Sequence, residues 1–123
     1  MTEILQLPWP PSVNHYWKHF RNRAIIGEAG MRYRNQVWAA VHRSRTSRTE
    51  PQRLQFGTLR LSVILNCYPP DKRVRDLDNL PKAVLDSLSK ARVWTDDSQI
   101  DILTTVRMDV EKPGRIVVSI ETL

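Results

Sequence analysis

Residues 59–91, LRLSVILNCYPPDKRVRDLDNLPKAVLDSLSKA, contain a strand pattern followed by a helix pattern. Apolar and polar residues alternate from 59 to 67, which is typical of a β-strand with one buried face, and the YPP sequence at 68–70 ends that strand. From Asn79 to Ala91 the apolar residues recur at helical spacing: Leu80, Val84, Leu85 and Leu88. Asp78 has the chemistry of an N-cap, and Pro81 is tolerated because it falls in the first turn. This stretch therefore predicts a strand that leads into a helix, with acidic residues at the junction.

The segments on either side of this stretch predict the other elements of a small domain. Residues 3–7 indicate a short strand, residues 13–27 a loop or partly ordered arm, and Glu28 to about Ser44 a helix. Residues 45–53 are polar and basic and predict a flexible loop, while strands near 102–110 and 115–121 flank a short turn and predict a hairpin. The resulting order is β-α-β-α-β-β. We therefore expect residues 1–123 to form a single α+β domain with a mixed sheet, two helices and a C-terminal hairpin.

The composition favours a small globular protein that meets a polyanion. Of the 123 residues, 41% are hydrophobic, which is enough to bury a core without disulfides or a structural metal. The formal charge is +6, and nine Lys or Arg stand against two Glu between Lys18 and Arg53. There is one cysteine, no zinc-ligand spacing, no signal-peptide pattern and no apolar run long enough for a membrane span. We expect a soluble intracellular protein.

Carboxylates in two places are candidate metal ligands. Asp76 and Asp78 would point to the same side of an extended segment, and the pair Asp96 and Asp97 follows the helix, where the chain can return toward the first pair. Such oxygen ligands suit Mg²⁺, which can polarise a phosphodiester and activate water. Lys82 lies one helical turn after Asp78 and could support the charge that develops at phosphorus.

Structural explanations exist for each of these residues and remain open at this point. Asp78 could be only a helix cap, Asp78 and Lys82 could form an ordinary helical ion pair, and Asp96 and Asp97 could close a loop. We interpret Asp86 as a solvated helix residue. The cations that immediately precede the acids favour chemistry on a phosphate backbone over these explanations: Lys72, Arg73 and Arg75.

The segment SVNHYWKHFRNR, residues 12–23, mixes aromatic rings with cations. Bases stack on aromatic side chains and phosphates pair with Lys or Arg, so this composition suits contact with nucleic acid. The candidate contacts are Tyr16, Trp17, Lys18, Arg21 and Arg23, although the two aromatic residues could instead belong to the core. Asn14 follows a proline-rich turn that could aim its amide inward.

Four segments together resemble the RusA-type Holliday junction resolvases of bacteria and their phages. They are LPWPPSVNHYW at 7–17, GEAGMRYR at 27–34, RDLDNLPKAVLDSL at 75–88 and VWTDDSQI at 93–100, in the family's order and covering most of the chain. The resemblance implies that the metal-binding carboxylates fall on Asp76, Asp78 and Asp97 and the active-site lysine on Lys82. Asn79 occupies the matching polar position, and we group it with Asp96 and Asn14 as supporting residues. The sequence departs from the family pattern at Pro81 and at Trp17.

The resemblance also implies an activity and its partners. We expect a homodimeric, metal-dependent endodeoxyribonuclease that uses Mg²⁺, with Mn²⁺ as a substitute, to resolve four-way DNA junctions by paired symmetric cuts in recombination and repair. It would act in the cytoplasm, be encoded by a bacterium or phage, and need no membrane and no small organic cofactor. Two alternatives remain: a non-enzymatic basic DNA-binding protein, and a nuclease that acts mainly on other branched nucleic acids.

Overall fold

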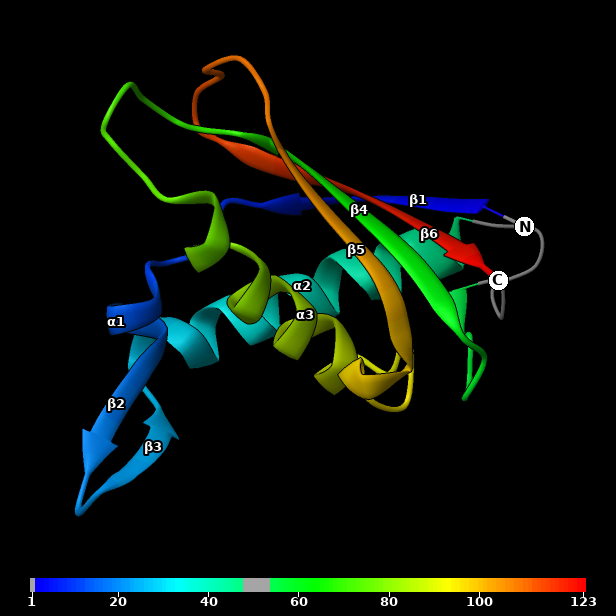
Figure 1. Cartoon of the computed structure of the whole chain (residues 1–123), viewed down its shortest axis with the longest axis horizontal. Helices are drawn as coiled ribbons and strands as arrows, with labels where there is room; N and C mark the ends of the chain where they lie inside the picture. Colours follow the sequence, from blue (N-terminus) through cyan, green and yellow to red (C-terminus); the bar gives the residue numbers. More distant parts are fainter. Residues whose placement is uncertain (1, 48–53) are drawn as a thin grey trace.

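The computed structural model describes residues 2–47 and 54–123 of the chain. Its centre is a four-stranded sheet in the order β1-β6-β4-β5, and helices lie on one face of that sheet (Figure 1). The strands are β1 (Thr2–Pro8), β4 (Leu61–Tyr68), β5 (Ile100–Arg107) and β6 (Arg115–Thr122). β6 is antiparallel to both β1 and β4, whereas β5 is parallel to β4. The predicted α+β class with a mixed sheet is confirmed.

Alternation along the strands separates a buried face from an outer face. In β4 the buried side chains are Leu61, Val63, Leu65 and Cys67, as their spacing predicts. The central pairing sets Leu65 opposite Val118 of β6, and Val118 in turn opposite Leu5 of β1, so three buried side chains form one row across the sheet. The outer face carries exposed apolar residues, among them Ile4, which is 60% exposed.

Two helices cover the buried face. α2 (Glu28–Thr46) contributes Tyr33, Val37 and Val41, and α3 (Pro81–Lys90) contributes Val84 and Leu88. Complete burial of such a side chain stabilises the fold by about 1.5–3 kcal/mol. The predicted helices and strands outside residues 13–27 are therefore confirmed, with ends that differ by a few residues. None of the described helices is long and apolar enough to cross a lipid bilayer.

Residues 13–26 are more regular than the predicted loop. They form α1 (Val13–Tyr16) and a hairpin of β2 (Trp17–Phe20) and β3 (Arg23–Ile26), which projects away from the body of the domain (Figure 1). Arg21 and Asn22 at the tip have φ values of 51° and 61°. This left-handed backbone geometry is the one that a common type of two-residue hairpin turn requires at both positions. The absence of clean sequence periodicity follows because most hairpin side chains are exposed and no buried face imposes alternation.

The two C-terminal strands are consecutive and joined by a short connection, but they do not pair with each other. β4 lies between them, because β6 enters the sheet between β1 and β4 while β5 adds to the other edge of β4. The pairing of β4 with β5 is parallel, and a parallel pair needs a crossover, which α3 provides. The direct pairing of these two strands that we expected for a C-terminal hairpin is thus wrong. Closeness in sequence does not decide which strand of the sheet has an unpaired edge when the next strand is added. The predicted loop at 45–53 lies largely outside the described residues, and its first residues, Arg45 and Thr46, belong to α2.

Candidate active site

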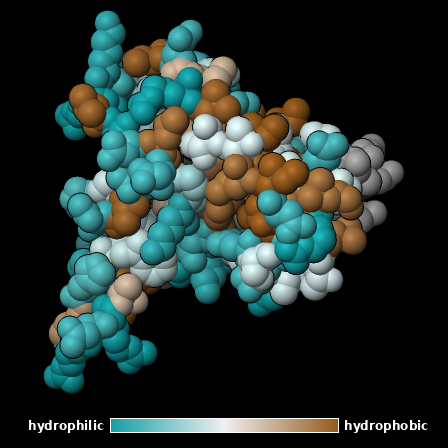
Figure 2. All heavy atoms as spheres, viewed as in Figure 1, coloured by the Kyte–Doolittle hydropathy of each residue, from teal (hydrophilic) through white to brown (hydrophobic). Residues whose placement is uncertain are grey.

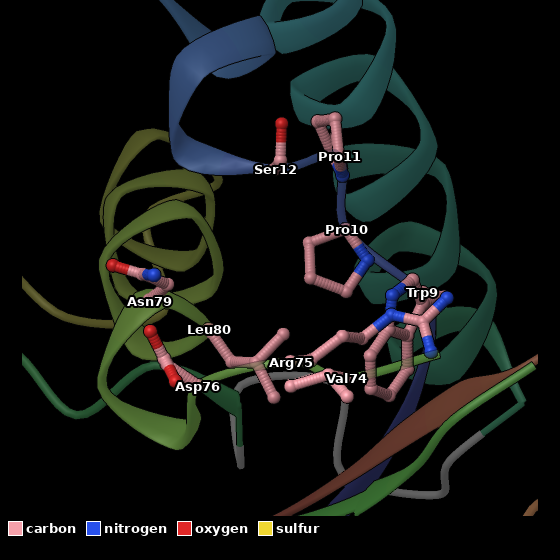
Figure 3. Close-up of a pocket in the computed structure, with 9 residues that line it drawn as sticks. All are labelled: Trp9, Pro10, Pro11, Ser12, Val74, Arg75, Asp76, Asn79 and Leu80. Atoms are coloured by element: carbon pink, nitrogen blue, oxygen red, sulfur yellow. The ribbon is translucent and has the colours of Figure 1, made fainter. Parts of the chain in front are cut away.

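The acidic motif at the start of α3 is a turn and not an extended segment. Asp76 has an extended backbone, but the next residues form the short 3₁₀ helix η2 (Leu77–Asn79), so the segment is not extended through Asp78. The extended backbone from which we predicted a shared direction of the two carboxylates therefore ends at Asp76. Asp76 and Asn79 line a hollow of about 300 Å³, with Trp9, Pro10 and Ser12 across from them (Figure 3).

Two of the structural explanations for Asp78 do not hold. The N-cap of α3 is Leu80 and Pro81 is its first residue, so Asp78 does not cap this helix. Among the described residues, no ion pair joins Asp78 to Lys82. Asp76 and Asp78 are both exposed at the surface. A cap and a helical ion pair therefore do not account for this acidic motif.

The cations beside the motif differ in how they are held. Arg75 forms an ion pair of 2.8 Å with Asp71 and lies 5.6 Å from the centre of the Trp9 ring, which leaves 20% of its side chain exposed. This hydrogen bond from Arg75, together with one from the backbone of Arg73, lowers the pKa of Asp71. Lys72 and Arg73 are exposed. Arg75 is thus held in place in the lining of the hollow, whereas Lys72 and Arg73 are accessible to an incoming anion.

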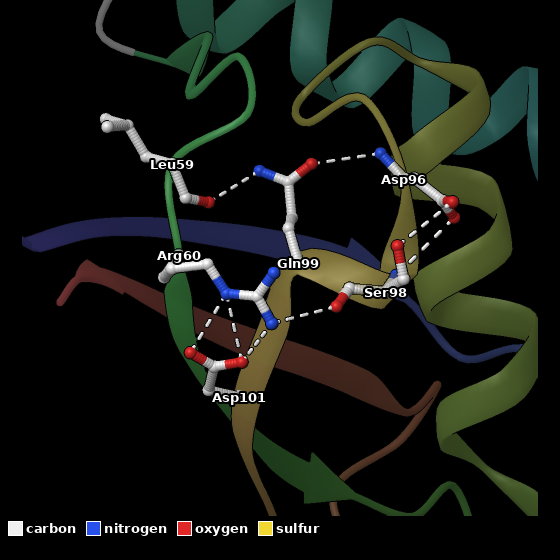
Figure 4. Close-up of polar contacts among 6 residues, drawn as sticks. All are labelled: Leu59, Arg60, Asp96, Ser98, Gln99 and Asp101. Atoms are coloured by element: carbon white, nitrogen blue, oxygen red, sulfur yellow. Dashed lines mark hydrogen bonds and ion pairs between the residues drawn. The ribbon is translucent and has the colours of Figure 1, made fainter.

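The second acidic pair lies in η3 (Asp97–Gln99) and its cap. Asp96 accepts hydrogen bonds from the backbone and hydroxyl of Ser98, and the backbone amide of Asp96 donates to the side-chain oxygen of Gln99 (Figure 4). Asp96 therefore closes a loop, as its structural explanation stated. Asp97 is different: it is half-buried and accepts a bond of 2.8 Å from Trp94 Nε1. Burial raises the pKa of Asp97, the bond from Trp94 lowers it, and the charges of Asp86 and Asp96 raise it further.

The two acidic pairs lie at opposite ends of α3. This helix has ten residues, which corresponds to about 15 Å at ~1.5 Å per residue. The strand β5 shows the same separation. Its first residue, Ile100, directly follows η3, whereas its last residue, Arg107, donates a hydrogen bond of 2.7 Å to the backbone of Arg75, beside Asp76. Within residues 2–47 and 54–123, no three His, Cys, Asp or Glu side chains lie close enough to hold a metal ion. The expected return of the second pair to the first does not occur within one chain, because the crossover delivers it to the opposite end of the sheet.

Lys82 faces the projecting arm instead. Its ammonium lies 5.3 Å from the centre of the Trp17 ring. Asn14, Trp17, Lys18 and Lys82 line a hollow of about 420 Å³, so the amide of Asn14 shares a cavity with the candidate lysine. Lys18, Arg21 and Arg23 are exposed on the hairpin, and the arm is mainly hydrophilic (Figure 2).

Tyr16 is completely buried, so its predicted contact with DNA is wrong. Its hydroxyl is used inside the protein, where it bonds to Asp86, and Arg34 donates to both. The interpretation of Asp86 as a solvated residue is also wrong. The sequence carried one usable signal, the position of Asp86 beside the apolar stripe of α3. It carried none for partners 52 and 70 residues away.

Comparison with known proteins gives a consistent result. The family model described as "Endodeoxyribonuclease RusA" matches residues 8–121. A crossover junction endodeoxyribonuclease RusA of Escherichia coli (strain K12) is 38% identical over 120 residues, which cover 97% of this chain and 93% of that protein. The protein of the same name from Enterobacteria phage 82 is 39% identical with the same coverage. A third, from Escherichia coli O139:H28, is 35% identical over 123 residues, or 99% of this chain and 96% of that protein.

Proposed function

The chain belongs to the RusA family of endodeoxyribonucleases, and we propose that it is a crossover junction endodeoxyribonuclease that resolves four-way (Holliday) DNA junctions. The observation that carries this proposal is the match along nearly the whole chain, which includes both acidic pairs and Lys82. The alternative of a non-enzymatic DNA-binding protein has no support, because the matched relatives are named as nucleases. The relatives come from bacteria and a phage, which supports our proposal that the protein acts in the bacterial cytoplasm.

We further propose that cleavage depends on Mg²⁺, with Mn²⁺ as a substitute. The donor chemistry fits, because carboxylate oxygens are the protein ligands that Mg²⁺ prefers. The geometry of one chain does not fit, because α3 separates Asp76 and Asp78 from Asp97. The proposal therefore requires a second copy of the chain to bring its Asp97 to the Asp76 and Asp78 of the first. A bound Mg²⁺ would polarise the phosphate and lower the pKa of an attacking water.

The same requirement supports a homodimer. Two symmetric cuts need two sites related by a two-fold axis, and a closed two-fold assembly of identical chains supplies them. In such an assembly the exposed hairpin cations Lys18, Arg21 and Arg23 would hold the DNA backbone by charge, together with Lys72 and Arg73. The ammonium of Lys82 would neutralise negative charge at the phosphate that is cut.

The experiment is cleavage of a synthetic four-way junction by the wild-type protein and by Asp78→Asn, with a linear duplex and a flap as control substrates. We expect paired nicks in Mg²⁺, none in EDTA, and slow or no cleavage of the linear duplex. Asp78→Asn should bind the junction as tightly as the wild type and lose cleavage by roughly 100-fold or more.

Unchanged Mg²⁺-dependent cleavage by Asp78→Asn would contradict the role of Asp78. No cleavage with any divalent metal would contradict the nuclease activity. Faster turnover of the flap than of the junction would favour the nuclease of other branched nucleic acids.

A further inference from the structure

A cluster of three polar side chains joins the arm to both helices. The carboxylate of Asp86 on α3 accepts a hydrogen bond from the Tyr16 hydroxyl at the end of α1 and one of 3.0 Å from Arg34 Nε on α2. Arg34 also forms an ion pair of 2.8 Å with Asp86 and donates to the Tyr16 hydroxyl at 3.1 Å. About a fifth of the Asp86 and Arg34 side chains is exposed, and Tyr16 is fully buried. This cluster is too sheltered to be an ordinary surface ion pair.

The cluster leads directly to the lysine of the candidate site. The ring of Tyr16 packs edge-on against Trp17, with ring centres 5.0 Å apart and planes at 63°. The Lys82 ammonium in turn makes a cation–π contact with the Trp17 ring, 5.3 Å from the ring centre, and we call this ring the seat of the ammonium. Asp86 and Lys82 are one helical turn apart on α3. The contacts therefore run from α3 through Tyr16 and Trp17 and back to α3.

Charge explains why Asp86 matters for Lys82. The Arg34 guanidinium lies 6.0 Å from the centre of the same Trp17 ring, so two cations approach one aromatic side chain. Two unpaired cations beside one ring would repel each other. The carboxylate of Asp86 neutralises Arg34, which allows the ammonium of Lys82 to remain at the ring.

The arm is also fixed in place by the backbone. The amide of Gly27 donates to the carbonyl of Tyr16 at 2.9 Å, where the hairpin returns to α2. A Cβ on Gly30 would lie 2.5 Å from the same carbonyl, so only glycine lets α1 approach α2 this closely. Tyr16, whose ring packs against Trp17, is thus held by both its side chain and its backbone, whereas the lysine side chain has a flexible four-carbon stem.

We propose that Tyr16, Arg34 and Asp86 are positioning residues that fix the Trp17 indole as the seat from which the Lys82 ammonium is presented to DNA. This inference rests on the proposed function, in which Lys82 supports phosphodiester cleavage. The cluster itself touches no substrate. It acts by limiting the positions of Lys82 and by removing the charge of Arg34 that would displace it.

The test is a double-mutant cycle between Tyr16→Phe and Lys82→Ala, measured as single-turnover cleavage of a four-way junction at saturating protein. Tyr16→Phe leaves the pair between Asp86 and Arg34 in place but removes the hydroxyl bond that ties the Tyr16 ring, and through it the Trp17 ring, to α3. We expect it to slow cleavage about 10-fold in the wild-type background and less than about 2-fold in the Lys82→Ala background. Junction affinity in EDTA should stay within about 2-fold, because Tyr16 is buried and its hydroxyl is not open to DNA.

A control removes a different Arg–Asp pair, which lies outside the Tyr16 cluster. Asp101→Asn breaks the exposed pair between Arg60 and Asp101, which lies at the η3 end of the sheet (Figure 4). We expect its cleavage rate to remain within about 2-fold of wild type in both backgrounds. Loss of rate in Asp101→Asn equal to that in Tyr16→Phe would show a general effect on the fold and overturn the proposal.

A second pair of variants tests the seat without altering the cluster. Trp17→Phe keeps an aromatic face for the ammonium, and Trp17→Leu does not. We expect Trp17→Phe to retain most of the rate and Trp17→Leu to fall to the rate of Lys82→Ala. Equal rates for Trp17→Phe and Trp17→Leu would overturn the proposal, as would an equal loss from Tyr16→Phe in both backgrounds. A wild-type protein that cuts no junction would instead overturn the proposed function. Lys82→Ala that cuts normally would overturn the role of Lys82, and this inference with it, but not the nuclease activity.

Discussion

The two ends of α3 carry the same type of residue in opposite environments. At the η2 end, Asp76 and Asp78 are exposed. At the η3 end, Asp96 is engaged as a cap, and Asp97 is half-buried and held by Trp94. One end is open to a ligand and the other is fixed in advance. A metal bound between an open pair and a fixed single carboxylate would combine an entry path with a defined third ligand, and three experiments test that contrast.

The largest effect is expected from mixing two inactive variants, Asp76→Asn and Asp97→Asn. If each site takes Asp76 from one chain and Asp97 from the other, a mixed dimer contains one intact site and one with both substitutions. We therefore expect each variant alone to lose cleavage by roughly 100-fold or more, and the mixture to regain nicking of one strand of a junction.

Nicking is measured on a junction labelled on each strand in turn. A mixture of Asp76→Asn with Asp78→Asn is the control, because both substitutions lie at the same end of α3 and leave each site with one damaged residue. If the Asp76→Asn and Asp97→Asn mixture stays inactive while subunits exchange, the carboxylates belong to one chain and the shared site is wrong.

A smaller effect is expected on stability when Asp96 is replaced. Asp96→Ala removes the carboxylate that accepts from Ser98, and loss of such a cap costs about 1 kcal/mol. Asp78→Ala should leave the free energy of unfolding nearly unchanged, because Leu80 and not Asp78 precedes α3. Urea denaturation of both variants measures the difference, and equal losses would mean that the η2 end is as fixed as the η3 end.

The smallest effect is expected from Asp97→Asn, and it depends on pH. Because burial raises the pKa of Asp97 in the folded protein, the ionised carboxylate destabilises the fold above that pKa. The stabilising preference for the protonated form is complete below the pKa of the unfolded chain and is lost as the pH rises through the folded pKa. Asp97→Asn should therefore raise Tm by roughly 1–3 °C at pH 7 and leave it unchanged at pH 3. Asp76→Asn, at the exposed end, is the control, and a Tm that falls at pH 7 would contradict the sign of the shift.

Residues with a local pattern were predictable, and residues with distant partners were not. The alternation of Leu61, Val63 and Leu65 and the helical spacing of the apolar residues in α3 predict which side chains are buried. The contrast between Asp76 and Asp97 follows from tertiary structure, because it depends on which sheet edge receives β5. The same limit applies to Asp86, whose partners come from α1 and α2. The resemblance to a family indicated the candidate residues, whereas the folded chain showed that Asp76 and Asp97 are far apart within one copy.

The crossover helix has one more consequence, for how this protein can change in evolution. α3 joins two strands of one sheet, so its ten residues also set the spacing between the η2 and η3 acids. Insertion or deletion of a single turn would move one end by about 5.4 Å relative to the other. Substitutions along the exposed side of α3 would leave that spacing intact. The helix is therefore a spacer whose length is constrained more strongly than most of its surface composition. Lineages that preserve the activity should conserve its number of turns and Lys82, and vary its other exposed residues.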